Sequence, residues 1–170
     1  MKVVAWIAPG TWDAVVATAS KRPQTDRITL VAVADNTQDV PSGMLSGLMG
    51  RAHAPGYEYY DKISQEAAQS LLDQAKERLG RECETQLLVG KTEEVVTESL
   101  EDAGLLILAR DGDRSRLGPK SIGRHTRFVL DHAPCTVALV WPGETPPLES
   151  IPETLPPEED PANLPHERDN

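Results

Sequence analysis

Five short apolar segments alternate with longer amphipathic ones, and this alternation limits the fold more than any other feature of the sequence. The apolar segments are residues 3–8, 28–34, 85–89, 105–109 and 136–141. Their length and their content of Val, Ile, Leu and Ala are typical of strands that are covered on both faces. Strands that alternate with helices form a parallel sheet with right-handed crossovers. The sequence therefore predicts an α/β fold with an open, doubly wound, five-stranded parallel sheet and helices on both faces.

Four helices are predicted between these strands, because apolar residues recur there every three or four positions. The predicted helices are residues 12–19, 63–79, 93–103 and 121–131. Thr11 and Thr92 stand where helix-capping residues are favoured, and Gly80 is expected to end the second helix. The buried face expected for that second helix comprises Ile63, Ala67, Leu71, Ala75 and Leu79.

An insert precedes the second helix and carries small residues every four positions in its segment 42–50. Nine residues are too few to cross a membrane, which takes about 20. The segment is expected to form a short helix or a flap near the strand ends. Both a ligand lid and a packing or partner contact are consistent with it. Tyr57, Tyr59 and Tyr60 follow, and both packing and stacking on a base are consistent with their position.

The net charge of −10 excludes some classes of partner, because the chain has 27 acidic residues against 17 Lys and Arg. Such a chain has no bulk attraction to nucleic acid or to an anionic membrane surface. No signal-peptide pattern opens the sequence. The two cysteines, Cys83 and Cys135, form no disulfide framework. These features predict a cytoplasmic protein.

Proline and acidic residues are concentrated in the last part of the chain. Residues 142–165 contain eight of the 14 prolines, and residues 144–170 contain eight acids and one arginine. Segments of this composition bury too little apolar surface to offset chain entropy. The sequence therefore predicts a folded domain over residues 1–142 and a disordered, Pro-rich acidic tail over residues 143–170.

Catalytic and metal-binding motifs are absent from the sequence. It contains no nucleophile elbow, no P-loop and no H-E-x-x-H or C-x-x-C motif. The four histidines have no metal-ligand spacing, and no carboxylate follows the first strand at Ala8-Pro9-Gly10. We expect no catalytic residue, no metal site and no enzymatic activity.

The last quarter of the predicted domain resembles the universal stress protein family. The resemblance is carried by residues 106–115, by Gly123 and by residues 127–137, and the most specific part is His132-Ala133-Pro134-Cys135-Thr136-Val137. Gly90-Lys91-Thr92 also looks like the turn that leads into the third helix of that family. The resemblance covers residues 2–141 and implies the strand order 3-2-1-4-5. It also implies a small cytoplasmic stress-response protein, with ATP or AMP bound in one branch of the family.

The resemblance further implies a homodimer. In the family the fifth strand lies at the edge of the sheet and can pair with its copy, here through residues 136–141, from Thr136 to Trp141. An exposed apolar edge must be paired or covered. A monomer whose tail covers this edge is the alternative.

The ATP-binding branch carries G-x2-G-x9-G-[ST] after the fourth strand, and this sequence keeps one of the four positions. Arg110 and Asp113 replace the first two glycines, Gly123 remains, and Arg124 replaces the Ser or Thr. The acid that the family has after the first strand falls at about Pro9.

Six basic residues nevertheless lie between residues 110 and 127, against two acids. Guanidinium groups bind phosphate through paired donors, and a helix N-terminus attracts anions. The residues predicted to bind a nucleotide or another anion are Gly10, Thr11, Val33, Arg110, Arg114, Gly118, Lys120, Ser121, Gly123 and Arg124.

Two functions remain open from the sequence. The chain is either a regulatory module that senses a phosphate-bearing anion, or an interaction module for a regulatory protein partner that has lost ATP binding. In the second case the basic loop is solvated or paired with Asp111, Asp113 or the acidic tail.

Overall fold

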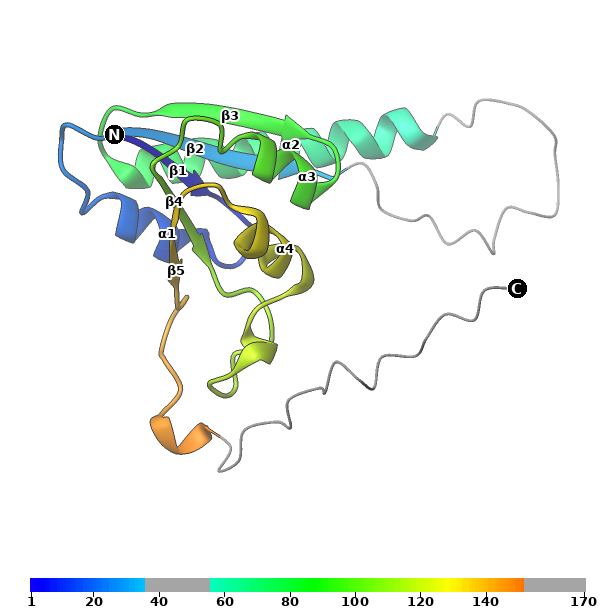
Figure 1. Ribbon diagram of the computed structural model, residues 1–170. Coiled ribbons are helices and arrows are strands. Elements are labelled where there is room, and N and C mark those ends of the chain that lie inside the picture. Colours follow the sequence, from blue (N-terminus) through cyan, green and yellow to red (C-terminus); the bar gives the residue numbers. More distant parts are fainter. Residues whose placement is uncertain (36–55, 152–170) are drawn as a thin grey trace, which may run out of the picture.

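The computed structural model contains one five-stranded sheet in the order β3-β2-β1-β4-β5 (Figure 1). The structure describes residues 1–35 and 56–151, and for residues 56–61 it describes only the backbone. The strands are β1 (Lys2–Trp6), β2 (Arg27–Ala34), β3 (Glu84–Val89), β4 (Leu105–Ala109) and β5 (Thr136–Val140). Every pair of neighbouring strands is parallel. The predicted fold class and the strand order are therefore confirmed.

Two helices cover each face of the sheet. The helices are α1 (Trp12–Ala19), α2 (Gly56–Leu79), α3 (Thr92–Glu98) and α4 (Arg124–His132). Side chains of α1 and α2 pack in one hydrophobic core, and side chains of α3 and α4 pack in a second core. Alternate residues of the strands enter opposite cores, as the two-residue period of a strand requires.

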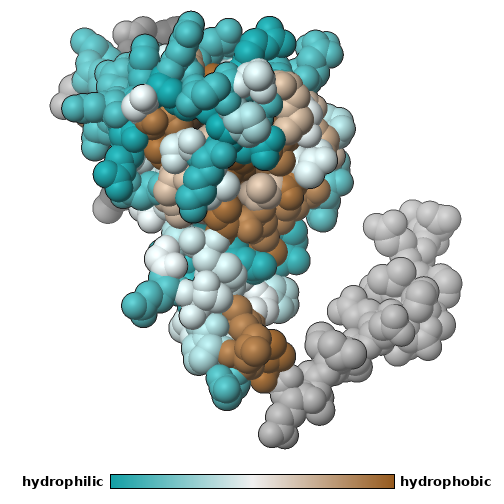
Figure 2. Space-filling view, turned by 90° about the vertical axis from the view of Figure 1, so that its left-hand side faces the viewer, coloured by the Kyte–Doolittle hydropathy of each residue, from teal (hydrophilic) through white to brown (hydrophobic). Residues whose placement is uncertain are grey.

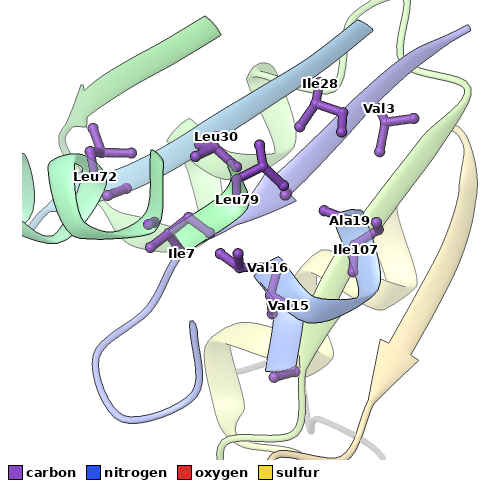
Figure 3. Close-up of a cluster of buried hydrophobic side chains, with 14 of the residues drawn as sticks. Val3, Ile7, Val15, Val16, Ala19, Ile28, Leu30, Leu72, Leu79 and Ile107 are labelled. Atoms are coloured by element: carbon purple, nitrogen blue, oxygen red, sulfur yellow. The ribbon is translucent and has the colours of Figure 1, made fainter. Parts of the chain in front are cut away.

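The first core lies between the sheet and the pair α1 and α2 (Figure 3). Val3 of β1 and Ile107 of β4 face it, while their chain neighbours Val4 and Leu106 face the second core. All four side chains are fully buried. Aliphatic side chains thus fill both sides of the central strands, as the nearly continuous apolar segments predicted.

The buried face of α2 differs from the predicted one. Ile63 is 45% exposed, and the residues of α2 that are buried are Ala68, Leu72, Ala75 and Leu79. The first turns of this 24-residue helix extend beyond the sheet, so they have no strand to pack against (Figure 1). The segment 42–50 lies outside the described residues, as do the side chains of the three tyrosines.

Neither of the two threonines predicted to cap a helix makes a capping hydrogen bond. Thr92 is the first residue of α3, Lys91 is its N-cap, and the Thr92 hydroxyl donates to a carboxylate oxygen of Asp35 at 2.7 Å. Thr11 occupies the N-cap position of α1 but makes no capping hydrogen bond. Its hydroxyl donates to the Ala8 carbonyl at 3.4 Å. A capping hydroxyl accepts a hydrogen bond from a backbone N–H of the first helical turn. Thr92 lies one residue inside α3, and the Thr11 backbone, with φ −134° and ψ −11°, is not in the extended conformation typical of an N-cap.

The last helix begins later than predicted. Ser121 belongs to a short 3-10 helix, η1 (Pro119–Ser121), and α4 starts at Arg124 with Gly123 as its N-cap. The extended backbone of Ile122, with φ −107° and ψ 116°, separates the two helices. Amphipathic periodicity does not detect such a break because it reads side-chain spacing rather than backbone angles.

The chain continues beyond β5 as an arm that contacts the β4–α4 loop. The arm carries the 3-10 helix η2 (Leu148–Ser150). The backbone N–H of Leu117 donates to the Ser150 hydroxyl at 3.0 Å, and this hydroxyl donates to the Pro147 carbonyl at 2.6 Å. The arm is the first part of the predicted tail, whose residues 152–170 lie outside the described part of the chain.

Candidate functional site

Two loops lie together at the carboxyl edge of the sheet. They follow β1 and β4, which are parallel neighbours with Ala5 paired to Ile107. The strand order reverses between β1 and β4. In doubly wound sheets, the crevice at this reversal is where ligands bind. Most of the predicted site residues lie in the segments 7–11 and 110–124 around this reversal.

The loop after β1 is a tight turn. Gly10 has φ +77°, a left-handed conformation that favours glycine. The backbone N–H groups of Thr11 and Trp12 both donate to the Ala8 carbonyl, at 3.3 and 3.1 Å. Thr11 is buried and its hydroxyl bonds within the same turn. Val33 of β2 is half-buried and packs on the second core.

Arg110 ties the β4–α4 loop to the end of β5. Its backbone N–H donates to the Val140 carbonyl at 3.0 Å, and its guanidinium lies over the Trp141 ring at 4.6 Å. One guanidinium nitrogen donates to the hydroxyl of Ser121, which is fully buried and donates in turn to the Gly118 carbonyl at 2.6 Å. Arg110 and Ser121 thus hold the loop together from inside.

The Asp111 carboxylate lies at the start of α4. The backbone N–H of Gly123 donates to it at 2.7 Å. A Cβ atom at Gly123 would lie 2.7–2.9 Å from the atoms of this carboxylate. Backbone N–H groups at a helix start are the donors that bind phosphate in many nucleotide sites. In this loop the chain supplies the anion for the Gly123 donor itself.

Backbone hydrogen bonds close the rest of the loop. The N–H of Gly112 donates to the Ser121 carbonyl at 3.0 Å, and the N–H of Asp113 donates to the Lys120 carbonyl at 2.8 Å. Hydrogen bonds from the side chain and the backbone N–H of Ser115 hold the pKa of the Asp113 carboxyl below its ordinary value of 3.8. Both acids of the loop therefore accept hydrogen bonds from backbone N–H groups.

The loop cations, in contrast, are turned to solvent. The exposed residues are Arg114, Arg116, Lys120 and Arg124. None of the four forms an ion pair with another of the described residues. Arg127 is also exposed and donates to the Pro119 carbonyl at 2.7 Å. The predicted site thus divides into an internal group, with Arg110, Ser121 and Gly123, and an external group of cations.

A contact between a histidine and a carboxylate joins α3 to α4 beside this loop. The ring Nδ1 of His125 lies 2.7 Å from a carboxylate oxygen of Glu93. A hydrogen bond from its own backbone N–H and the contact with His125 hold the pKa of the Glu93 carboxyl below its ordinary value of 4.5. This contact fixes the start of α4 against α3.

Comparisons with known proteins identify the fold, although no family model and no curated protein matches the sequence. The hypothetical protein MJ0577 is 13% identical, with a TM-score of 0.58, over 85% of this chain and 97% of that chain. A universal stress protein in complex with cAMP is 14% identical, with a TM-score of 0.56, over 84% of this chain and 98% of that one. The chain has the universal stress protein fold.

A third solved structure has the same fold. It is a protein of the universal stress protein family from Burkholderia pseudomallei, 17% identical, with a TM-score of 0.53, over 84% of this chain and 96% of that chain. These proteins match the chain over almost their whole length. At such identities the likeness concerns the fold, and the site has to be judged from the residues of this chain.

The described part of the chain carries no grouping of residues typical of a metal site or a membrane span. Within it, no three His, Cys, Asp or Glu side chains are grouped so that they could hold a metal ion. No helix among the described residues is long and apolar enough to cross a membrane. Cys83 and Cys135 are free thiols, and burial raises the pKa of both.

Asp111, Trp141 and Ser150 were not among the predicted site residues. Asp111 lies 12 positions before Gly123, and Trp141 lies 31 positions after Arg110. No periodic pattern links residues at these separations, so only the folded loop reveals the contacts. Asp111 was predicted only as a possible partner of the basic residues of the loop, whereas its carboxylate accepts the Gly123 N–H.

Proposed function

We propose that this chain is a non-enzymatic regulatory module of the universal stress protein type that acts through contacts with other protein chains. Its β4–α4 loop, in this proposal, does not hold the phosphates of a nucleotide at the start of α4. The observation that carries the proposal is the Asp111 carboxylate on the Gly123 N–H, at 2.7 Å. The proposal includes a cytoplasmic location and a role in a stress response, which the family resemblance implies.

A phosphate and the Asp111 carboxylate would compete for the same hydrogen-bond donor. A phosphate at the Gly123 N–H would share a single donor with a carboxylate, and two like charges at hydrogen-bond distance repel each other. Arg110 stands where a glycine would let a phosphate approach the backbone, and its guanidinium is bonded to Ser121 and stacked on Trp141. The Asp111 carboxylate and the Arg110 side chain therefore both oppose binding of a phosphate at the Gly123 N–H.

A second candidate function is favoured by a different observation. Four exposed cations, three of them arginines, surround the outside of the same loop. A phosphate-bearing anion such as ATP or AMP could bind there through paired guanidinium donors. The solved universal stress protein in complex with cAMP gives this candidate a precedent within the same fold.

Direct binding measurements separate the two candidates. Titration calorimetry of the natural chain with ATP, AMP and cAMP is expected to give dissociation constants above about 1 mM, that is, a binding free energy weaker than about −4 kcal/mol. The variant Asp111→Gly removes the competing carboxylate and is expected to bind ATP more tightly than the natural chain. The variant Asp131→Gly serves as the control, because Asp131 is an exposed acid in the last turn of α4, at the opposite end of the helix from Gly123.

Tight binding of a nucleotide by the natural chain, unaffected by Asp111→Gly, would contradict the first candidate. If that binding were lost on charge reversal at Arg114 and Arg124, the external cations would be the site. Native mass spectrometry of the purified protein would show the same result as a nucleotide-sized adduct on each chain.

We further propose that two copies pair through β5. This strand forms one edge of the sheet, and residues 137–140 are all half-buried apolar side chains. Figure 2 shows the face of the molecule that lies on the left-hand side of Figure 1, and hydrophobic residues are exposed on it. An apolar edge strand is prone to pair with another chain, and pairing with its own copy gives a closed two-fold dimer.

A substitution on each edge of the sheet tests this pairing. Val137→Lys on β5 is expected to convert a dimer into a monomer, because two charges would meet near the two-fold axis. Lysine can keep its aliphatic stem against apolar neighbours, so the fold is expected to remain intact. Val89→Lys on β3 is the control and is expected to leave the dimer unchanged. Sedimentation velocity measures both, and a natural chain that sediments as a monomer would refute the pairing.

A further inference from the structure

The β4–α4 loop carries the external cations and also contacts the arm that precedes the acidic C-terminal segment. Leu117, between Arg116 and Gly118, donates its backbone N–H to the Ser150 hydroxyl at 3.0 Å. The described part of the chain ends one residue later, at Ile151. In Figure 1 the arm descends from β5 to a position beside the β4–α4 loop. The described part of the chain therefore ends next to the loop that carries the exposed cations.

The charges of the two parts are complementary. We define the cation patch as Arg114, Arg116, Lys120 and Arg124, all exposed and without an ion pair among the described residues. Residues 152–170 contain six acids and one arginine, and three of the acids are consecutive: Glu158, Glu159 and Asp160. The two acids of the loop, Asp111 and Asp113, accept hydrogen bonds from backbone N–H groups. The hydrogen bonds from Ser115 and the nearby charges of Arg116 and Lys120 help to lower the pKa of the Asp113 carboxyl.

The tether is long enough for these charges to meet. Glu158 follows Ile151 by seven residues, and a Pro-rich chain spans about 3.1 Å per residue, which gives a reach of roughly 20 Å. A segment held this close has an effective concentration of about millimolar or more. Weak ion pairs that would not form between separate molecules can then form within one chain.

We propose that the acidic segment 158–160 binds the cation patch of the same molecule. The occupant of this surface is thus the chain's own C-terminal segment, held by salt-sensitive ion pairs and anchored through Ser150. An external anion would have to displace this segment to reach the patch. The inference goes beyond the proposed function and does not depend on whether a nucleotide binds.

Trypsin provides the test, because it cleaves after Arg and Lys and the patch offers four such sites. The variant E158Q/E159Q/D160N keeps the length and nearly the shape of the segment but removes its three charges. At a low salt concentration of about 0.02 M, cleavage within residues 114–124 is expected to be at least about threefold faster in this variant than in the natural chain. At about 0.5 M salt the two rates are expected to converge, because screening removes the ion pairs.

A charge-matched control separates docking from the effect of net charge. The variant E77Q/E98Q/E101Q removes three exposed acids from the folded body and is expected to be cleaved like the natural chain. Amide NMR shifts of residues 114–124 give a second measurement, and they are expected to change only in the segment variant. Equal cleavage of the natural chain and the segment variant at low salt would overturn the proposal. Protection that increases with protein concentration would also overturn it, because the contact would then join different molecules.

Discussion

Replacing Leu106 by alanine is expected to lower the free energy of unfolding by about 2–5 kcal/mol, the range for large-to-small changes in a core. Leu106 lies in β4, is fully buried, and pairs in register with Val4 of β1 and Val137 of β5. Its side chain faces the second core, whose other members include Val96 of α3. The change removes a contact between the central strands and the helices that cover them.

Urea denaturation followed by circular dichroism measures this loss. The matched control is Leu148→Ala, because Leu148 is 74% exposed on the arm. The control is expected to change the free energy of unfolding by less than about 0.5 kcal/mol. Similar losses in both variants would mean that β4 does not pack in the center of the sheet.

Replacing Gly112 by alanine is expected to cost about 1–3 kcal/mol and to open the β4–α4 loop, because the added methyl group has no room. Its Cβ atom would lie 2.3 Å from the Lys120 carbonyl oxygen and 2.9 Å from the carbonyl carbon of Ser121. Both atoms belong to the backbone and cannot rotate away. The two backbone segments of the loop, 112–113 and 120–121, would have to move apart. The hydrogen bond from the Asp113 N–H to the Lys120 carbonyl would then break.

Hydrogen exchange measures this opening at the Asp113 amide, and denaturation measures the loss of stability. Gly123→Ala is the informative control, since the three atoms nearest to its Cβ atom would all belong to the side chain of Asp111. That carboxylate can rotate away, so the loop pairing of Gly112 with Ser121 is expected to persist. Unchanged exchange at Asp113 in the Gly112→Ala variant would contradict the described closure of the loop.

The strands were predictable because each carries its own apolar segment. Leu105–Ala109 was predicted to the residue, and the other strands differ by one or two residues at their ends. The spacing of apolar residues does not determine the order of the strands in the sheet, and this order was predicted from the family resemblance. The shifted buried face of α2 was not predictable either, because it depends on where the sheet ends beneath the helix.

The candidate site was predictable as a region but not as a set of roles. Arg110 and Gly123 were identified, yet the sequence could not show that one packs on Trp141 and that the other bonds to Asp111. An arginine in a loop has the same appearance in a sequence whether it binds a ligand or a neighbouring ring. The long-range contact decides its role, and this contact exists only after β4 and β5 have paired.

The two edges of the sheet differ in polarity, and this difference limits how many copies the proposed pairing can join. The apolar side chains of β5 begin at residue 137, whereas the first half of β3, Glu84, Thr85 and Gln86, is polar and exposed and only its second half, up to Val89, is apolar. A sheet that can pair with another copy at both edges can form an open fibre. A sheet that can pair at one edge only forms a closed dimer, because no edge remains available once that one is paired. In the proposed pairing through β5, assembly along the sheet therefore ends at two copies, because the polar start of β3 does not favour addition of a further copy.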